Sequence, residues 1–163
     1  MIQNVKKILS EIPSSVTLLA ACKSRTAQEI NAAIEGGIKV IGENYLQETL
    51  KVYPLVRKGV EWHFIGHLQR NKVKKIVKIF DMIETLDDLK IAEEIDKRCA
   101  QIGKIMPVLI EVNSAKEPQK AGIFPEEVED FILEVSKFKN IKASGLMTMG
   151  PLVSNIEEIR PFF

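Results

Sequence analysis

Cysteine and histidine are both scarce in this chain, with two of each among 163 residues. Cys22 and Cys99 are far apart and form no C-x-x-C pair, so the sequence predicts neither a disulfide framework nor a zinc site. His63 and His67 have the i, i+4 spacing that puts two side chains on one face of a helix. Because the residues between them are β-like and include Gly66, no helix is expected there, and we predict no metal site.

The chain also has no surplus of charge of one sign and no long apolar run. Lysine and arginine number 23 against 22 aspartates and glutamates, which leaves a net charge of +1. A protein that binds nucleic acid mainly by neutralising phosphates needs a larger basic surplus, so no nucleic-acid partner is predicted. The first residues include Lys6 and Lys7 and lack the apolar stretch of a signal peptide. We therefore expect a cytoplasmic protein with no membrane partner.

What is present is the composition of an ordinary globular domain. Hydrophobic residues make up 45% of the chain and charged residues 28%, which excludes a disordered or collagenous protein. A chain of 163 residues is about the size of one domain, and it can bury roughly two thirds of its unfolded surface in a single core. We expect residues 1–163 to form a single domain.

Short apolar segments alternate with amphipathic ones along the chain. After the first apolar run, Thr26 and Glu29 form the T-x-x-E pattern of a capping box, and the segment stops at Gly36-Gly37. The pattern predicts strands over 16–22, 40–42, 62–66, 82–84, 106–112 and 143–148. It predicts helices between them, over 26–35, 45–54, 73–80, 87–102 and 125–138, and a last helix that begins near 155 or 156. The basic run Lys72 to Lys78 is most simply the solvated face of one of these helices.

Strict alternation of apolar strands with helices predicts a parallel sheet covered by helices, because parallel strands need crossover connections. A doubly wound open sheet usually carries a glycine-rich phosphate loop after its first strand, whereas Lys23-Ser24-Arg25-Thr26 contains no glycine. A (β/α)8 barrel of the TIM type carries its chemistry at the carboxyl ends of its strands. Suggestive residues lie at or just after these ends, namely Lys23, Glu43, Asn44, His67, Asn113 and Met147. We therefore favour an α/β fold of the TIM-barrel type, with about six of the eight βα units present.

Lys23 follows the first apolar segment and is expected to project from the carboxyl end of that strand. A lysine in apolar surroundings loses affinity for its proton, and the free amine is a nucleophile that condenses with an aldehyde. A solvated lysine just past a strand is the simpler interpretation when the position is taken alone. The neighbouring segments therefore decide how Lys23 is interpreted.

Three motifs lie at the first three strands: A-A-C-K-S, G-E-N-Y-L-Q-E and W-H-F-I-G-H-L-Q-R-N-K. In this order they resemble the pyridoxal-phosphate homeostasis protein family, whose members carry A-V-S-K-T-like, G-E-N-Y-x-Q-E and W-H-F-I-G-x-L-Q-x-N-K segments. Later segments agree as well, namely L-I-E-V-N, K-A-G and G-L-M-T-M. The resemblance covers essentially the whole chain. It departs at Cys22 and Ser24, where the family more often has Ser and Thr.

The resemblance implies a barrel like the N-terminal domain of alanine racemase, with Lys23 forming an internal aldimine with pyridoxal 5′-phosphate (PLP). It also implies a cofactor pocket lined by residues at matching motif positions: Asn44, His63, Asn113 and Met147. The physical logic agrees, because a conjugated aldehyde gives the lysine something to capture, and polar groups at several strand ends can orient the ring.

Members of the family continue past the equivalent of Phe163 with a seventh and an eighth strand, and the resemblance implies that segments there hold the cofactor phosphate. We therefore expect a C-terminally incomplete barrel that binds PLP weakly or not at all. Two or three lost charge-assisted hydrogen bonds, at about 1.5 to 3 kcal/mol each, lower the affinity by several powers of ten. A sheet that stops at its sixth strand also exposes two edges, so we expect association of this chain, although the full-length family is expected to be monomeric.

The leading functional hypothesis is a carrier or buffer that holds PLP and passes it to PLP-dependent apoenzymes without substrate turnover. The rival is a PLP-dependent amino-acid racemase or decarboxylase. Racemases with a similar barrel place a tyrosine opposite the lysine, and the only two tyrosines here, Tyr45 and Tyr53, fall on a predicted helix. A lysine-dependent aldolase without a cofactor, and an interaction domain in which Lys23 is inert, are further alternatives. The motif set disfavours the aldolase.

Overall fold

The computed structural model describes residues 1–163 and contains one sheet of six parallel strands. The strands are β1 (Leu19–Ala21), β2 (Val40–Glu43), β3 (Glu61–Phe64), β4 (Met82–Leu86), β5 (Met106–Val112) and β6 (Ile141–Thr148). Each strand pairs in parallel with the next one along the chain. The sheet therefore has β1 at one edge and β6 at the other.

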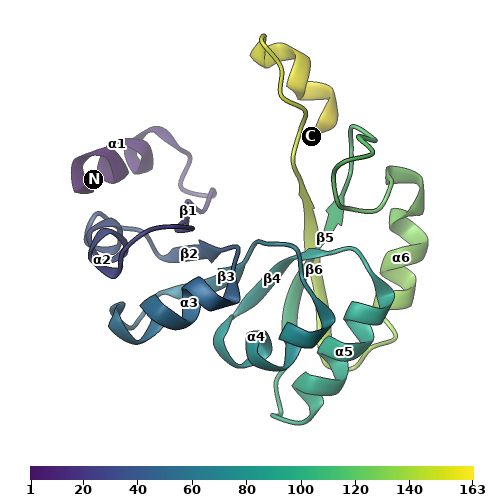
Figure 1. Ribbon diagram of the computed structural model, residues 1–163. Coiled ribbons are helices and arrows are strands. Elements are labelled where there is room, and N and C mark those ends of the chain that lie inside the picture. Colours follow the sequence, from purple (N-terminus) through teal and green to yellow (C-terminus); the bar gives the residue numbers. More distant parts are fainter.

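Helices connect the strands and follow the outer side of the curved sheet (Figure 1). The α-helices are α1 (Ile2–Glu11), α2 (Ala27–Glu35), α3 (Leu46–Val52), α4 (Val73–Ile79), α5 (Leu89–Ala100) and α6 (Val128–Val135). Shorter 3-10 helices are η1 (Tyr53–Leu55), η2 (Arg70–Lys72), η3 (Pro125–Glu127) and η4 (Ile156–Phe162). The helices all fall short of the length and apolar character needed to cross a bilayer. Figure 1 shows the last part of the chain, with η4, extending away from the sheet.

The strand order separates the two architectures that the sequence left in competition. A doubly wound sheet reverses its direction at a switch point and has helices on both faces. Here every crossover joins neighbouring strands in the same direction, and right-handed crossovers then put the helices on a single face. The fold is thus a partial α/β barrel, which confirms the expected fold class.

The core lies between the sheet and the helices, as a cluster of 26 buried residues. Alternate strand residues point into it, among them Ile41, Ile83 and Val108. Phe64 of β3 and Phe80 after α4 meet edge to face, with ring centroids 5.3 Å apart. The residues between these core positions face the concave side of the sheet, and that side carries the polar groups described below.

Helix α2 begins where the sequence predicts, because its capping box forms. The Thr26 hydroxyl accepts a hydrogen bond from the Glu29 amide at 3.3 Å, and the Glu29 carboxylate accepts one from the Thr26 amide at 2.8 Å. The helix ends at Gly36 and Gly37, and Gly37 has a φ of +115° that favours glycine. This helix therefore places β1 and β2 side by side as neighbouring parallel strands.

Three local features differ from the sequence-based expectations. Strand β1 is shorter than the predicted 16–22, because it is an edge strand that pairs only with β2. The N-terminal helix α1 was not predicted, and it packs on the end of α2, where a Cβ added to Gly36 would come within 2.9 Å of the Val5 Cβ. The last predicted helix is the 3-10 helix η4, in which Pro161 provides no backbone donor.

Candidate site at the carboxyl ends of the strands

Lys23 lies in a tight loop that follows β1 directly. The loop is anchored at Cys22, whose amide donates to the Gly42 carbonyl of β2 at 2.8 Å. Ser24 has a left-handed φ of 60°, uncommon for a residue other than glycine, and its amide donates to Glu48 Oε2 of α3 at 2.9 Å. The Lys23 side chain is exposed and has no hydrogen bond or ion pair with the rest of the chain. The apolar surroundings considered for Lys23 from the sequence are therefore absent, and its amine is open to solvent.

Two buried titratable groups lie at this loop, and burial disfavours the charged form of each. Glu43, the last residue of β2, is only 1% exposed, and its Oε2 has no hydrogen-bond partner. Burial, together with the nearby charge of Glu48, raises the pKa of Glu43 to about 7. Burial and the charge of Glu43 raise the pKa of the Cys22 thiol to about 12. Cys22 is therefore a buried thiol and not a second nucleophile beside Lys23.

Asn44 follows β2 and lies at the strand end next to that of Lys23. Its side-chain amide donates to the Ile65 carbonyl at 3.3 Å, so it spans the ends of β2 and β3. The backbone makes a very close approach there, because a Cβ added to Gly66 would lie 2.1 Å from the Asn44 carbonyl oxygen. Gly66 is therefore required for Asn44 to keep this position.

His63 is buried on the concave side of β3 between two carboxylates. Its Nδ1 is 2.5 Å from Glu84 Oε1, and its Nε2 is 3.4 Å from Glu61 Oε2. Burial by itself lowers the pKa of His63, but the hydrogen bonds and charges of Glu84 and Glu61 outweigh burial, so the pKa is raised. Because both ring nitrogens lie near carboxylates, these contacts hold the imidazole in place and favour its protonated, positively charged form.

Asn113 is buried just after β5, and its side chain makes all its hydrogen bonds within its own loop. Its amide nitrogen donates to the carbonyls of Glu117 at 2.8 Å and Lys120 at 3.3 Å, while its oxygen accepts from the Glu117 amide at 3.0 Å. Asn113 therefore shapes the loop after β5 and presents no free polar atom of its own.

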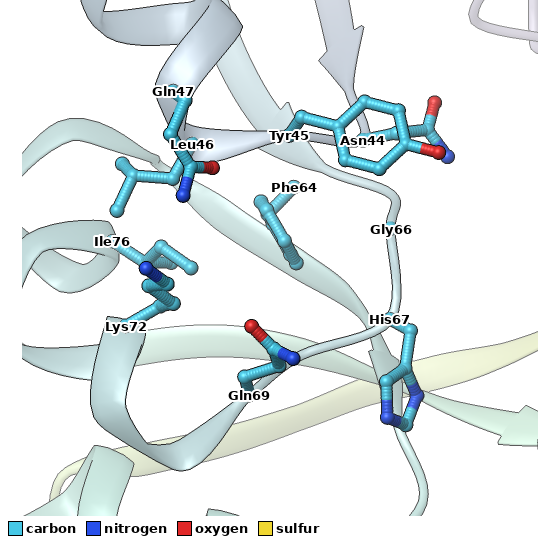
Figure 2. A pocket seen from close by; sticks show the side chains of 10 residues that line it. All are labelled: Asn44, Tyr45, Leu46, Gln47, Phe64, Gly66, His67, Gln69, Lys72 and Ile76. Atoms are coloured by element: carbon cyan, nitrogen blue, oxygen red, sulfur yellow. The ribbon is translucent and has the colours of Figure 1, made fainter.

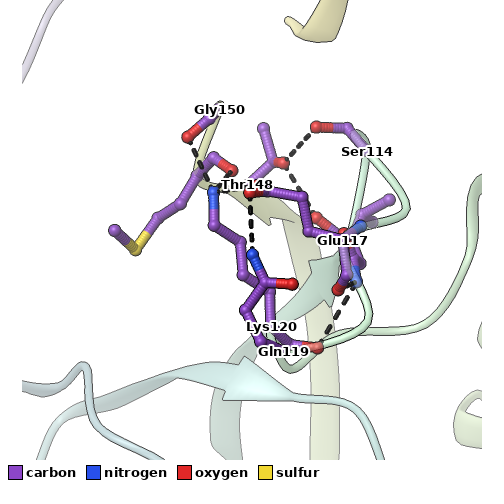
Figure 3. A network of polar contacts seen from close by, with 9 residues as sticks. Ser114, Glu117, Gln119, Lys120, Thr148 and Gly150 are labelled. Carbon is purple, nitrogen blue, oxygen red and sulfur yellow. Dashed lines mark hydrogen bonds and ion pairs between the residues drawn. The ribbon is translucent and has the colours of Figure 1, made fainter. Parts of the chain in front are cut away.

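A polar network joins that loop to the segment after β6 (Figure 3). Lys120 donates to the Gly150 carbonyl at 2.9 Å and forms an ion pair with Glu117. The hydroxyls of Ser114 and Thr148 are 2.8 Å apart. Met147 is half-buried on β6, opposite Glu111 of β5 in the register of the sheet. The carboxyl ends of β5 and β6 are thus held together by side-chain contacts as well as by the strand ladder.

The five candidate residues fall into separate groups around the sheet. Lys23 and Asn44 occupy neighbouring strand ends, Asn113 and Met147 belong to the β5–β6 pair, and His63 lies within β3. No hydrogen bond joins any two of these five side chains. The structure therefore arranges them along one sheet without bringing them into direct contact.

The sequence did not identify the acidic residues that contact His63 and the Lys23 loop, nor the half-buried Glu111 of β5. Glu84 binds His63, and Glu48 holds the Lys23 loop. Glu111 has a raised pKa, first because of burial and then because of Asp87, while His67 partly opposes both effects. The available signal was a carboxylate inside an apolar strand, as in M-I-E-T-L and L-I-E-V, because a charge at such a position is rarely buried without a partner.

These features define a barrel-type α/β domain with an exposed lysine directly after its first strand. A family model described as "Alanine racemase, N-terminal domain" matches residues 1–160, and the chain belongs to this family. It is 40% identical over 147 residues to the pyridoxal phosphate homeostasis protein of Aquifex aeolicus, a match that covers 90% of this chain and 64% of that protein. It is 34% identical over 148 residues to the protein of the same name from Synechocystis, covering 90% of this chain and 68% of that one.

Solved structures agree with this assignment. PipY of Synechococcus elongatus, in a structure without PLP, has a TM-score of 0.89 at 28% identity and is matched over 99% of this chain and 79% of its own. The structure of PipY with PLP bound has a TM-score of 0.84 at 27% identity, with the same coverage. An alanine racemase of Clostridium difficile has a TM-score of 0.81 at 14% identity and is similar in fold. The chain spans about two thirds of the length of the Aquifex and Synechocystis relatives.

Proposed function

We propose that this chain is a PLP-binding protein of PLP homeostasis, which holds the cofactor through Lys23 and passes it to PLP-dependent apoenzymes. The observation that carries the proposal is the position of Lys23 at the carboxyl end of β1, where its exposed side chain has no ion pair or hydrogen bond. The names of the relatives and the PipY structure with PLP bound support the choice of cofactor.

The residues around Lys23 fit an aldehyde-bearing cofactor. When bound, PLP supplies a conjugated aldehyde with which a primary amine condenses with loss of water. This chain presents the Lys23 amine without a competing ion pair, and the nearest thiol, Cys22, stays protonated. Glu48 restrains the loop through the Ser24 amide. We include Asn44, His63 and Met147 in the proposed pocket, and Asn113 as the residue that shapes one of its loops.

The proposal includes no substrate turnover. A PLP racemase needs acid/base groups on both sides of its substrate. Tyr53 packs edge to face on Trp62, with centroids 5.2 Å apart, among the residues on the helix side of the sheet. Tyr45 lies beside a cavity at the start of α3. These positions support a carrier over a racemase or decarboxylase.

We further propose a cytoplasmic location. Both cysteines are free and buried, in keeping with a reducing compartment.

The test is to incubate the protein with PLP, record the visible absorption of the imine, reduce with borohydride and map the modified residue. Because an incomplete barrel is expected to bind PLP weakly, the incubation uses a large excess of PLP. We expect labelling at Lys23 in the wild type and none in Lys23→Ala. The exposed Lys58, which has no ion pair, provides the matched control Lys58→Ala, which should be labelled like the wild type. Equal labelling of Lys23→Ala would overturn the site, and racemisation or decarboxylation of an amino acid by the loaded protein would favour the enzyme.

A further inference from the structure

A cavity of about 320 Å³ lies outside the concave side of the sheet, between the starts of α3 and α4 (Figure 2). Its apolar floor is formed by Leu46, Phe64 and Ile76, which belong to the core cluster on the helix side of the sheet. Of the residues assigned above to the proposed PLP pocket, only Asn44 also lines this cavity. The cavity is therefore separate from the surface that carries His63 and Met147.

The two longest motifs of the sequence meet at this cavity. G-E-N-Y-L-Q-E contributes residues 44–47, and W-H-F-I-G-H-L-Q-R-N-K contributes Phe64, Gly66, His67, Gln69 and Lys72. The Lys23 site uses Asn44, His63 and Glu48 from these motifs but leaves Gln47, Gln69 and Lys72 without a role. The cavity is where these three side chains converge.

The rim of the cavity has free hydrogen-bonding capacity. Gln47, His67, Gln69 and Lys72 have no side-chain hydrogen bond or ion pair elsewhere in the chain. Figure 2 shows the amides of Gln47 and Gln69 and the amine of Lys72 around the opening, with Phe64 behind them. Two carboxamides and an amine can together donate several hydrogen bonds to one ligand.

The charge of the lining residues and the volume of the cavity limit the kind of ligand that it can bind. Lys72 is the only formally charged residue among the ten that line the cavity, so the site favours an anion. No carboxylate of the lining neutralises it. At roughly 30 Å³ for each water-sized volume, the space holds a molecule of about ten non-hydrogen atoms. Its mixture of apolar floor and polar rim is typical of small-molecule sites.

We propose that this cavity binds a small organic anion, with its apolar or planar body on Leu46, Phe64 and Ile76 and its carboxylate or phosphate on Lys72. Gln47 and Gln69 donate to or accept from the polar substituents of the ligand. The basic residue expected to be part of a solvated helix face is thus a ligand-binding group, whereas Lys74 and Lys75 remain exposed to solvent. Binding at this site does not depend on the proposed PLP function.

The test uses the 163-residue protein without PLP and three probes of similar shape: benzoate, phenyl phosphate and neutral benzamide. Titrations to about 10 mM, followed by amide NMR shifts, cover the millimolar affinities expected of such small ligands. We expect saturable shifts around Gln47, Gln69 and Lys72 with at least one anion. The stronger of the two anions identifies carboxylate or phosphate as the preferred group, and benzamide should bind at least about tenfold more weakly.

Variants separate this site from general surface charge. Lys72→Gln should weaken anion binding by about tenfold, and Gln69→Glu should do the same by placing a negative charge on the rim. Lys74→Gln is the matched control, because it removes an exposed charge from the adjoining helix α4 without changing the lining, and it should bind like the wild type. Absence of saturable binding of both anions, equal binding of benzamide, or equal losses in Lys72→Gln and Lys74→Gln would overturn the proposal. Gln69→Glu keeps the test decisive if Lys72→Gln does not fold.

Discussion

At the scale of single residues, the side chain of His63 lies between the carboxylates of Glu84 and Glu61. The side chain of Glu84 is 17% exposed and that of Glu61 68%, so solvent screens the Glu61 interaction more strongly. We predict that Glu84→Gln lowers the pKa of His63, because burial then acts with little opposition. An NMR titration of the imidazole measures this change. Glu61→Gln is the control and should lower the pKa less, and an equal effect of the two variants would contradict the assignment.

The interaction between His63 and Glu84 also links stability to pH. Because the folded state raises the pKa of His63, its stabilising interaction is complete below the unfolded value of about 6.5 and is lost as the pH rises through the folded value. The difference in unfolding free energy between wild type and Glu84→Gln should therefore be larger near pH 5.5 than at high pH.

Glu43 also links stability to pH, over a lower pH range than His63, and its Oε2 has no hydrogen-bond partner. Its pKa rises from 4.5 to about 7 in the folded protein, so the neutral form is favoured on folding. The stability that this provides is present below pH 4.5 and is lost as the pH rises through about 7, an effect of about 3 kcal/mol at 1.36 kcal/mol per pKa unit. We predict that Glu43→Gln becomes more stable relative to wild type between pH 5 and 8.

Urea unfolding at the two pH values checks this prediction, with the exposed Glu93→Gln as control. A difference between wild type and Glu43→Gln that does not change with pH would show that Glu43 is ionised in the folded state.

Sequence alone could place Lys23 and Asn44, because a residue that directly follows an apolar strand can only be at its end. It could not assign the contacts of Asn113, because these depend on how the loop over residues 113–122 turns back on itself. Glu84 and Glu48 also escaped notice, since each acts on a residue brought near only by neighbouring strands and helices. The position of a residue at the end of a single strand is therefore predictable from sequence. Contacts between residues on different elements are not, because they depend on how the strands and helices are aligned.

At the scale of elements, α3 connects the Lys23 loop to the rest of the sheet. Its Glu48 is the only side chain that binds the Ser24 amide, and Ser24 is held in a left-handed conformation. We predict that Glu48→Ala slows the labelling of Lys23 by PLP several-fold, since the loop loses its restraint. Glu48→Gln should restore most of the rate, because its amide oxygen still accepts the hydrogen bond. The rate of borohydride-trapped labelling measures the effect, and equal rates for Glu48→Ala and wild type would exclude a positioning role.

Elements with strong local signals agree with the structure, and those decided by tertiary contacts do not. The capping box of α2 and the apolar run of β5 form at the predicted places, because their signals lie within the element. Helix α1 was not predicted because the packing role of isolated apolar residues such as Val5 depends on the end of α2, against which they lie. Strand β1 is shorter than its apolar run because strand length at an edge is determined by the partner strand.

At the scale of the whole molecule, the open sheet leaves two edges with unpaired backbone groups, at β1 and β6. Such edges pair readily with another chain, and β6 adds apolar exposure through Leu146. We predict that the 163-residue chain associates with rising concentration in light scattering and that Leu146→Lys reduces this association. Leu133 of α6 is 56% exposed, as is Leu146, so Leu133→Lys is a control for the loss of apolar surface alone. Because Leu133 lies away from the sheet edge, its variant should associate like the wild type. A monodisperse monomer in the wild type would contradict the role of the edges.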